Sequence, residues 1–159
     1  MSNLDIASYN RQGKVYNACN AAGVILTVVG TVVTGLTLSN PFGSGKKVIL
    51  ISAAFAPTTV PAATYVLGIA TGNSPTAVTL TTPVSSYSSD ASGRADAVAR
   101  VTSSATFPVA VVLARATGYA PTTPATTPTN FFDNVDGAIV LSPGGYCVVA
   151  EVGTAPTGI

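Results

Sequence analysis

The sequence predicts an all-β protein, a jelly-roll β-sandwich of about eight to ten short strands with an extended N-terminal arm. No window places apolar residues at the i, i+3, i+4, i+7 spacing of an amphipathic helix. Val, Ile and Thr, which favour strands, fill short runs that Gly and Pro interrupt. Runs such as residues 48–55 and 109–114 are nearly continuously apolar, so we expect these strands to be covered on both faces, one by the sandwich core and the other by a neighbouring subunit.

The first residues of the chain are polar and show no alternating pattern, which predicts an N-terminal arm, residues 1–13, that is ordered only where a partner holds it. The length of the remainder, residues 14–159, predicts a single sandwich domain. The expected strands, in order, are residues 14–17, 24–28, 32–38, 46–55, 64–70, 77–81, 97–103, 107–116, 138–141 and 146–152.

Two segments rich in Pro and Gly, residues 40–45 (NPFGSG) and 142–145 (SPGG), each precede a strand-like run and predict turns between strands. The lysines after the first turn do not complete a phosphate-binding loop, because the first Gly and the final Ser or Thr of that motif are missing. We therefore expect solvated lysines there. Residues 85–93 predict a polar loop, and the Pro/Thr-rich residues 121–129 resist regular structure.

Two polar clusters have candidate roles. Residues 133–137 (DNVDG) offer oxygen ligands for Ca²⁺, but no distal bidentate Glu accompanies them, so they predict an Asx-type turn before a strand. The second cluster either forms salt bridges between subunits or lies on a solvated loop and strand face, and it consists of Asp90, Arg94, Asp96 and Arg100.

The composition argues against an enzyme. The sequence contains no His, which removes the histidine base of common hydrolases and all imidazole metal ligands. No pair of carboxylates stands out as a general acid and base. We therefore expect no catalytic residues, no cofactor and no metal site.

The composition also limits the partners. A net charge of +1 supplies no basic field, so we expect neither nucleic acid nor a membrane as partner. The apolar residues 23–38 are too short for a membrane helix, and their glycines and β-branched residues predict paired strands. Cys19 and Cys147 match no zinc or CxxC pattern and predict buried free thiols in a chain made in a reducing cytoplasm.

Only 8% of the residues are charged, against about 25% in an ordinary soluble domain. Much of the surface must therefore consist of Thr and Ser or be covered by another chain. A contact with threefold symmetry would cover the strands that are apolar on both faces. The low charge and these strands together predict a homotrimer.

Two stretches are similar to segments of small structural proteins of tailed bacteriophages. They are residues 35–47 (GLTLSNPFGSGKK), followed by the strand Val-Ile-Leu, and residues 136–146 (DGAIVLSPGGY). The resemblance implies a capsid decoration (cement) protein, a jelly-roll trimer seated on the outer surface of the virion at junctions between major capsid proteins. Such a protein is synthesised in the cytoplasm of the bacterial host. The resemblance carries over no catalytic residues.

We therefore expect a structural virion protein that stabilises a phage capsid by bridging neighbouring major capsid proteins. The alternative is a receptor- or glycan-binding head domain of a phage tail fibre or bacterial adhesin. Sugar-binding surfaces favour Trp and Tyr. Trp is absent and aromatic residues make up 7% of the chain, which disfavours the alternative.

The arm supplies the candidate interface residues. It has too little apolar area to offset an ordering cost of about 1–2 kcal/mol per residue, so a partner surface must hold it. We expect Leu4, Ile6 and Tyr9 to be its apolar anchors on the capsid or an adjacent subunit, and Arg11 to pair with a carboxylate outside its own protomer. The competing interpretation is a frayed terminus without a role.

Overall fold

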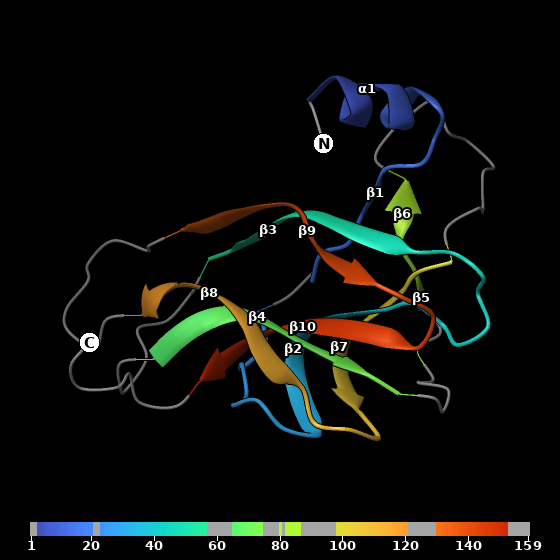
Figure 1. Ribbon diagram of the computed structural model, residues 1–159. Coiled ribbons are helices and arrows are strands. Elements are labelled where there is room, and N and C mark those ends of the chain that lie inside the picture. The colour runs from blue at the N-terminus through green and yellow to red at the C-terminus, as the bar shows by residue number, and fades with distance from the viewer. Residues whose placement is uncertain are drawn as a thin grey trace.

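The computed structural model describes residues 3–20, 23–56, 65–74, 80, 82–86, 98–120 and 130–152. In these residues one short helix, α1 (Asn3–Arg11), precedes a set of strands (Figure 1). The strands are β1 (Tyr16–Asn17), β2 (Val32–Ser39), β3 (Val48–Phe55), β4 (Tyr65–Asn73), β5 (Thr82–Pro83), β6 (Ser85–Ser86), β7 (Arg100–Thr106), β8 (Val112–Ala120), β9 (Phe131–Leu141) and β10 (Gly145–Val152).

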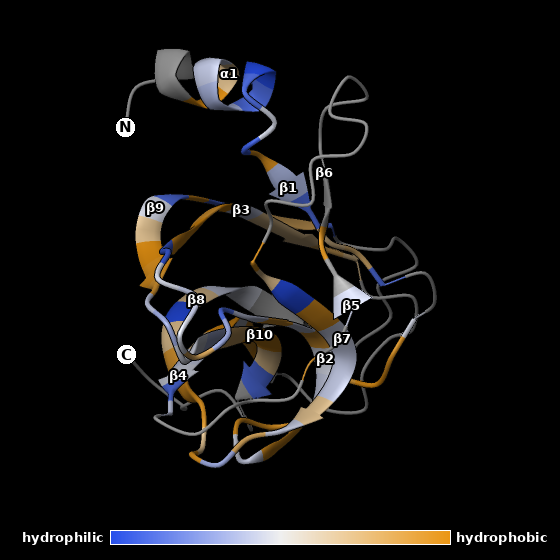
Figure 2. Cartoon of the chain, turned by 90° about the vertical axis from the view of Figure 1, so that its right-hand side faces the viewer, coloured by the Kyte–Doolittle hydropathy of each residue, from blue (hydrophilic) through white to orange (hydrophobic). Residues whose placement is uncertain are grey.

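Six strands form one antiparallel sheet in the order β5-β7-β2-β10-β4-β8. Strands β3 and β9 form an antiparallel ribbon that packs on one face of this sheet. A short pair, β1 and β6, lies with α1 on the far side of the ribbon (Figures 1 and 2). The prediction of an all-β sandwich is therefore confirmed, with two layers of unequal size.

Most of the expected strands are present with shifted ends. The two predicted turns join β2 to β3 and β9 to β10, as expected. Strand β9 is longer than expected, because it begins at Phe131 rather than at residue 138. Residues 107–111 do not begin β8 but form a loop before it. Of the expected strand at 77–81, only residue 80 lies within the described residues.

The expected strand at 24–28 is instead a strap, residues 25–29, that enters the large sheet between β2 and β10. These two strands pair only as far as Thr37 and Val148 and then separate. On one side the strap exchanges backbone hydrogen bonds with Glu151, at 3.1 and 3.4 Å. On the other side it donates a backbone N–H to the carbonyl of Thr34 at 3.4 Å. The strap thus satisfies backbone groups that the diverging strands leave open.

The core has two parts, one on each face of β10. Between the large sheet and the ribbon lies an aliphatic cluster of Ile69, Val135, Ile139, Leu141 and Cys147. The opposite face carries the second cluster, which consists of Val33, Ala70, Phe107, Val111, Tyr146, Val148 and Ala150.

The chain itself closes this second face. The ring of Phe107, from the loop before β8, stacks on the buried Tyr146 with centroids 4.0 Å apart. The Tyr146 hydroxyl donates to the carbonyl of Val109 in the same loop, at 2.7 Å. The chain's own loop therefore excludes water from this face of the central strand β10.

The expectation of an extended N-terminal arm is also wrong, because residues 3–11 form α1. The helix ends in a Schellman motif, in which Gly13 (φ 68°) donates to the carbonyl of Asn10 and Lys14 donates to that of Tyr9, both at 2.9 Å. Arg11 in the last turn interacts favourably with the helix dipole. The described residues contain no helix with the length and apolarity needed to span a membrane.

Candidate interaction surfaces

The two predicted turns lie side by side, and the buried side chain of Asn40 joins them. Its Nδ2 donates to the carbonyl of Lys46 at 2.8 Å and to that of Leu141 at 2.9 Å. Its Oδ1 accepts a hydrogen bond from the hydroxyl of Ser44 at 2.7 Å. Because a buried amide is costly unless it is bonded, these three bonds favour a single arrangement of the turns.

Backbone hydrogen bonds complete this contact. The N–H of Asn40 donates to the carbonyl of Gly145 at 2.8 Å, and the Asn40 carbonyl accepts from Gly144 at 2.9 Å. We call residues 40–46 and 142–145 the turn junction. The turns within residues 35–47 and 136–146 therefore meet at one place in the fold.

The turn junction carries an exposed aromatic ring. Phe42 is 59% exposed and lies over Gly144. A Cβ at that glycine would be 3.4 Å from the ring and 2.4 Å from the carbonyl oxygen of Ser74, so the close approach requires glycine. Lys46 and Lys47 follow the same turn and are both exposed. Sequence reasoning treated Phe42 only as a turn residue and did not single it out.

A second surface lies at the end of the molecule opposite α1, where Figure 2 shows apolar residues in loops. Two loops meet there, because Phe107 donates its N–H to the carbonyl of Thr31 at 2.8 Å and Val111 donates to that of Gly30 at 3.0 Å. Five aliphatic side chains on the strap, in the loop before β8 and at the first residues of β2 and β8 are 47% to 87% exposed. We call them the basal patch, and they are Ile25, Val28, Val32, Val109 and Val112.

The basal patch belongs to uncharged parts of the chain. The sequence has no charged residue between Lys14 and Lys46, and none between Arg100 and Arg115. These intervals were visible in the sequence, but the strand pattern did not show which side chains remain exposed.

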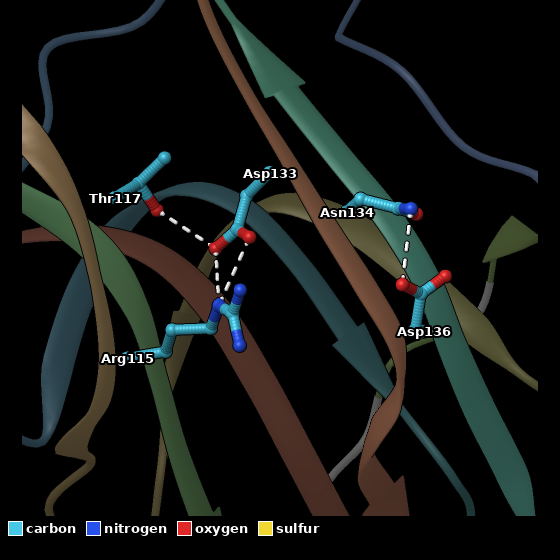
Figure 3. A network of polar contacts seen from close by, with 5 residues as sticks. All are labelled: Arg115, Thr117, Asp133, Asn134 and Asp136. Carbon is cyan, nitrogen blue, oxygen red and sulfur yellow. Dashed lines mark hydrogen bonds and ion pairs between the residues drawn. The ribbon is translucent and has the colours of Figure 1, made fainter.

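An ion pair links the two layers at one side of the sandwich (Figure 3). Arg115 of β8 donates from Nε to both carboxylate oxygens of Asp133 on β9, at 2.9 and 2.7 Å. The hydroxyl of Thr117 donates to the same carboxylate at 3.2 Å. Asp133 is only 6% exposed, so this charge-assisted contact compensates for the burial of its carboxylate.

The predicted Asx-type turn at residues 133–137 is wrong, because β9 runs through this segment. Leu50 is opposite Ile139 and Ser52 is opposite Asn134, so β9 has extra residues at this point and bulges. Asp136 and the glycine after it take positive φ, which the bulge requires. The Asn134 amide donates to Asp136 on the exposed side at 3.1 Å.

Several groups in these regions have shifted pKa values. The hydrogen bond and charge of Asp133 raise the pKa of Arg115, which keeps the guanidinium cationic. Burial raises the pKa of Cys147 to about 12 and also raises the pKa of Tyr146 and of Glu151. Cys147 is therefore a neutral core thiol at ordinary pH.

The predicted arm residues lie on α1 at the other end of the molecule. Ile6 is half-buried, Tyr9 is 45% exposed and Arg11 is exposed. Arg11 makes no ion pair with any described residue. The side chain of Leu4 lies outside the described residues. That these side chains contact a partner stays a prediction.

Two further predictions concern the cysteines and the charged residues at 90–100. Cys147 is a buried free thiol as predicted, but Cys19 is exposed, so the prediction is wrong for that residue. Of the charged cluster at 90–100, only Arg100 lies within the described residues, where its Nη1 donates to two nearby backbone carbonyls at 3.0 Å. No group of three metal-ligating side chains occurs among the described residues.

No protein-family model, curated protein or solved structure matches this chain.

Proposed function

We propose that this chain is a structural virion protein that decorates the outer surface of a phage capsid and stabilises it by bridging neighbouring major capsid proteins. The basal patch is the observation that carries the proposal. Five exposed aliphatic side chains on the strap, in the loop before β8 and at the starts of β2 and β8 favour burial against another protein surface. The proposal assigns no catalytic residue and no cofactor.

The basal patch suits a contact between copies of this chain. An uncharged aliphatic surface meets its own copy without repulsion between like charges, and burial contributes about 25 cal/mol per Å² of apolar surface removed from water. The proposal therefore includes the homotrimer, with the basal patch in its subunit contacts. The jelly-roll connectivity belongs to the same proposal and rests on the resemblance to phage proteins.

Capsid stabilisation follows from linkage. A protein that binds the assembled shell but not its separated subunits shifts the equilibrium toward the shell. The partners of the proposal are thus the major capsid protein and further copies of this chain. Binding by the arm residues Leu4, Ile6, Tyr9 and Arg11 is part of the same proposal.

The test is the copy number of this chain in purified virions, measured by quantitative mass spectrometry against the major capsid protein. A decoration protein is present in numbers comparable with the shell subunits, and shells stripped of it should disassemble at lower temperature. Absence from the virion would overturn the proposal. A few copies per particle together with glycan binding by the purified chain would instead establish the fibre-head alternative.

A further inference from the structure

We propose that Phe42, together with the adjacent Lys46 and Lys47, forms a docking element for the shell in addition to the arm residues, and that the Phe42 ring enters an apolar pocket edged by carboxylates on the major capsid protein. This inference rests on the proposed function, because it names the contacting residues and the chemistry of the surface that receives them.

The first support is the fixed conformation of the turn that carries Phe42. Asn40 is 1% exposed and fixes the turn that carries Phe42 through its three side-chain hydrogen bonds. A turn that is already fixed before binding loses little backbone freedom when its aromatic residue is buried. Aromatic anchors of this kind carry much of the energy of protein interfaces.

The second support is charge. Lys47 is exposed and forms no ion pair within the described residues, and the sequence has no Asp or Glu between Asp5 and Asp90. Cations beside an apolar anchor favour a partner pocket with carboxylates at its rim, because complementary charges guide association and fix orientation. The basal patch contains no charge of its own and lacks this means of selecting a partner.

Carbodiimide cross-linking of intact virions tests the inference, because this reagent joins a lysine amine directly to a contacting carboxylate. The chain has only three lysines, Lys14 near the arm and Lys46 and Lys47 after the turn junction. We expect peptides that join Lys46 or Lys47 to acidic residues of the major capsid protein. Cross-links to that protein from Lys14 alone would overturn the inference and place the arm at the shell.

A binding experiment tests the anchor. Purified Phe42→Ala should bind shells that lack this chain about 30-fold more weakly than the wild type, as expected for loss of an interface anchor. Phe42→Leu should keep most of the affinity. The matched control is Phe132→Ala, which removes a ring of 69% exposure on β9 and should bind normally.

The outcomes separate the two proposals. If Phe42→Ala binds shells as well as wild type, the docking role is wrong while the decoration function stands. If the wild-type chain binds no shells and is absent from virions, the proposed function itself is wrong. Because Phe42 is mostly exposed, we expect the variant to fold, and an unchanged thermal unfolding midpoint checks this.

Discussion

The two faces of β10 are closed by different kinds of structure. Toward the ribbon, Cys147 packs among aliphatic side chains from β9 and β4, so two regular layers meet. On the other face, Tyr146 is covered by an irregular loop through one ring stack and one hydrogen bond. A large sheet can therefore bury both faces without a second full sheet, but the loop-closed face depends on a few contacts.

The largest expected effect is on the loop-closed face. Tyr146→Ala removes the ring stack and the bond to Val109, and it should lower the free energy of unfolding by about 3–5 kcal/mol. Denaturant unfolding measures this loss. In hydrogen exchange the Val111 amide, which bonds to Gly30, should lose protection. Leu141→Ala is the matched change on the ribbon side. Equal loss of Val111 protection in both variants would contradict the interpretation that the two faces of β10 are closed independently of each other.

The ion pair that joins the two layers should give the next largest effect. Arg115→Met leaves the buried carboxylate of Asp133 without its cation, which should lower the free energy of unfolding. Adding Asp133→Asn removes the stranded charge and should restore part of the stability. A double-mutant cycle by urea unfolding measures the coupling, and additive losses would show that the pair contributes nothing as a unit.

The buried thiol of Cys147, on the ribbon side of β10, predicts that the free energy of unfolding depends on pH. Because burial raises the pKa of Cys147 from 9.0 to about 12, the folded state holds this proton at pH values where the unfolded state has lost it. Stability should be unaffected below about pH 9 and should fall by about 1.4 kcal/mol per pH unit above it. Unfolding at pH 8 to 10, below the range in which the buried Tyr146 hydroxyl adds a slope of the same sign, measures this slope. Cys147→Ala should flatten it, and an unchanged slope would assign the dependence to another group.

The smallest effect on stability is expected outside both core faces. Val112→Ser in the basal patch changes an exposed side chain, so the unfolding free energy of the monomer should move by no more than about 0.5 kcal/mol. If the patch forms the contacts between copies, the same change should shift the mass measured by light scattering from trimer toward monomer. A trimer that persists unchanged would exclude Val112 from the contact.

The fold class followed from the sequence because β-branched runs and Pro-Gly turns act locally, and both turns joined strands as expected. The strap and the loop before β8 could not be predicted in this way. Their apolar residues have strand composition, and only the separation of β2 from β10 decides that they remain outside the strands. The helix α1 was missed although Gly13 marked its end, because its apolar stripe is weak.

Much less of the candidate site was predictable. Residues 40–47 were identified as a turn, but its contact with the second turn depends on the bond from Asn40 to Leu141, about a hundred residues away in the sequence. The pairing of Arg115 with Asp133 likewise depends on how β8 lies beside β9. Side chains that contact one another across the two layers leave no local pattern in the sequence, whereas a turn does.

The position of β10 at the centre of the large sheet has a consequence for synthesis on the ribosome. Its neighbours β2 and β4 are translated well before it, and without it they belong to two separate groups of strands, β5-β7-β2 and β4-β8. Each group exposes an open edge, and such edges invite pairing with other chains. Nascent chains of this protein therefore pass through an interval of vulnerability to aggregation that ends only when β10 emerges and joins the two halves.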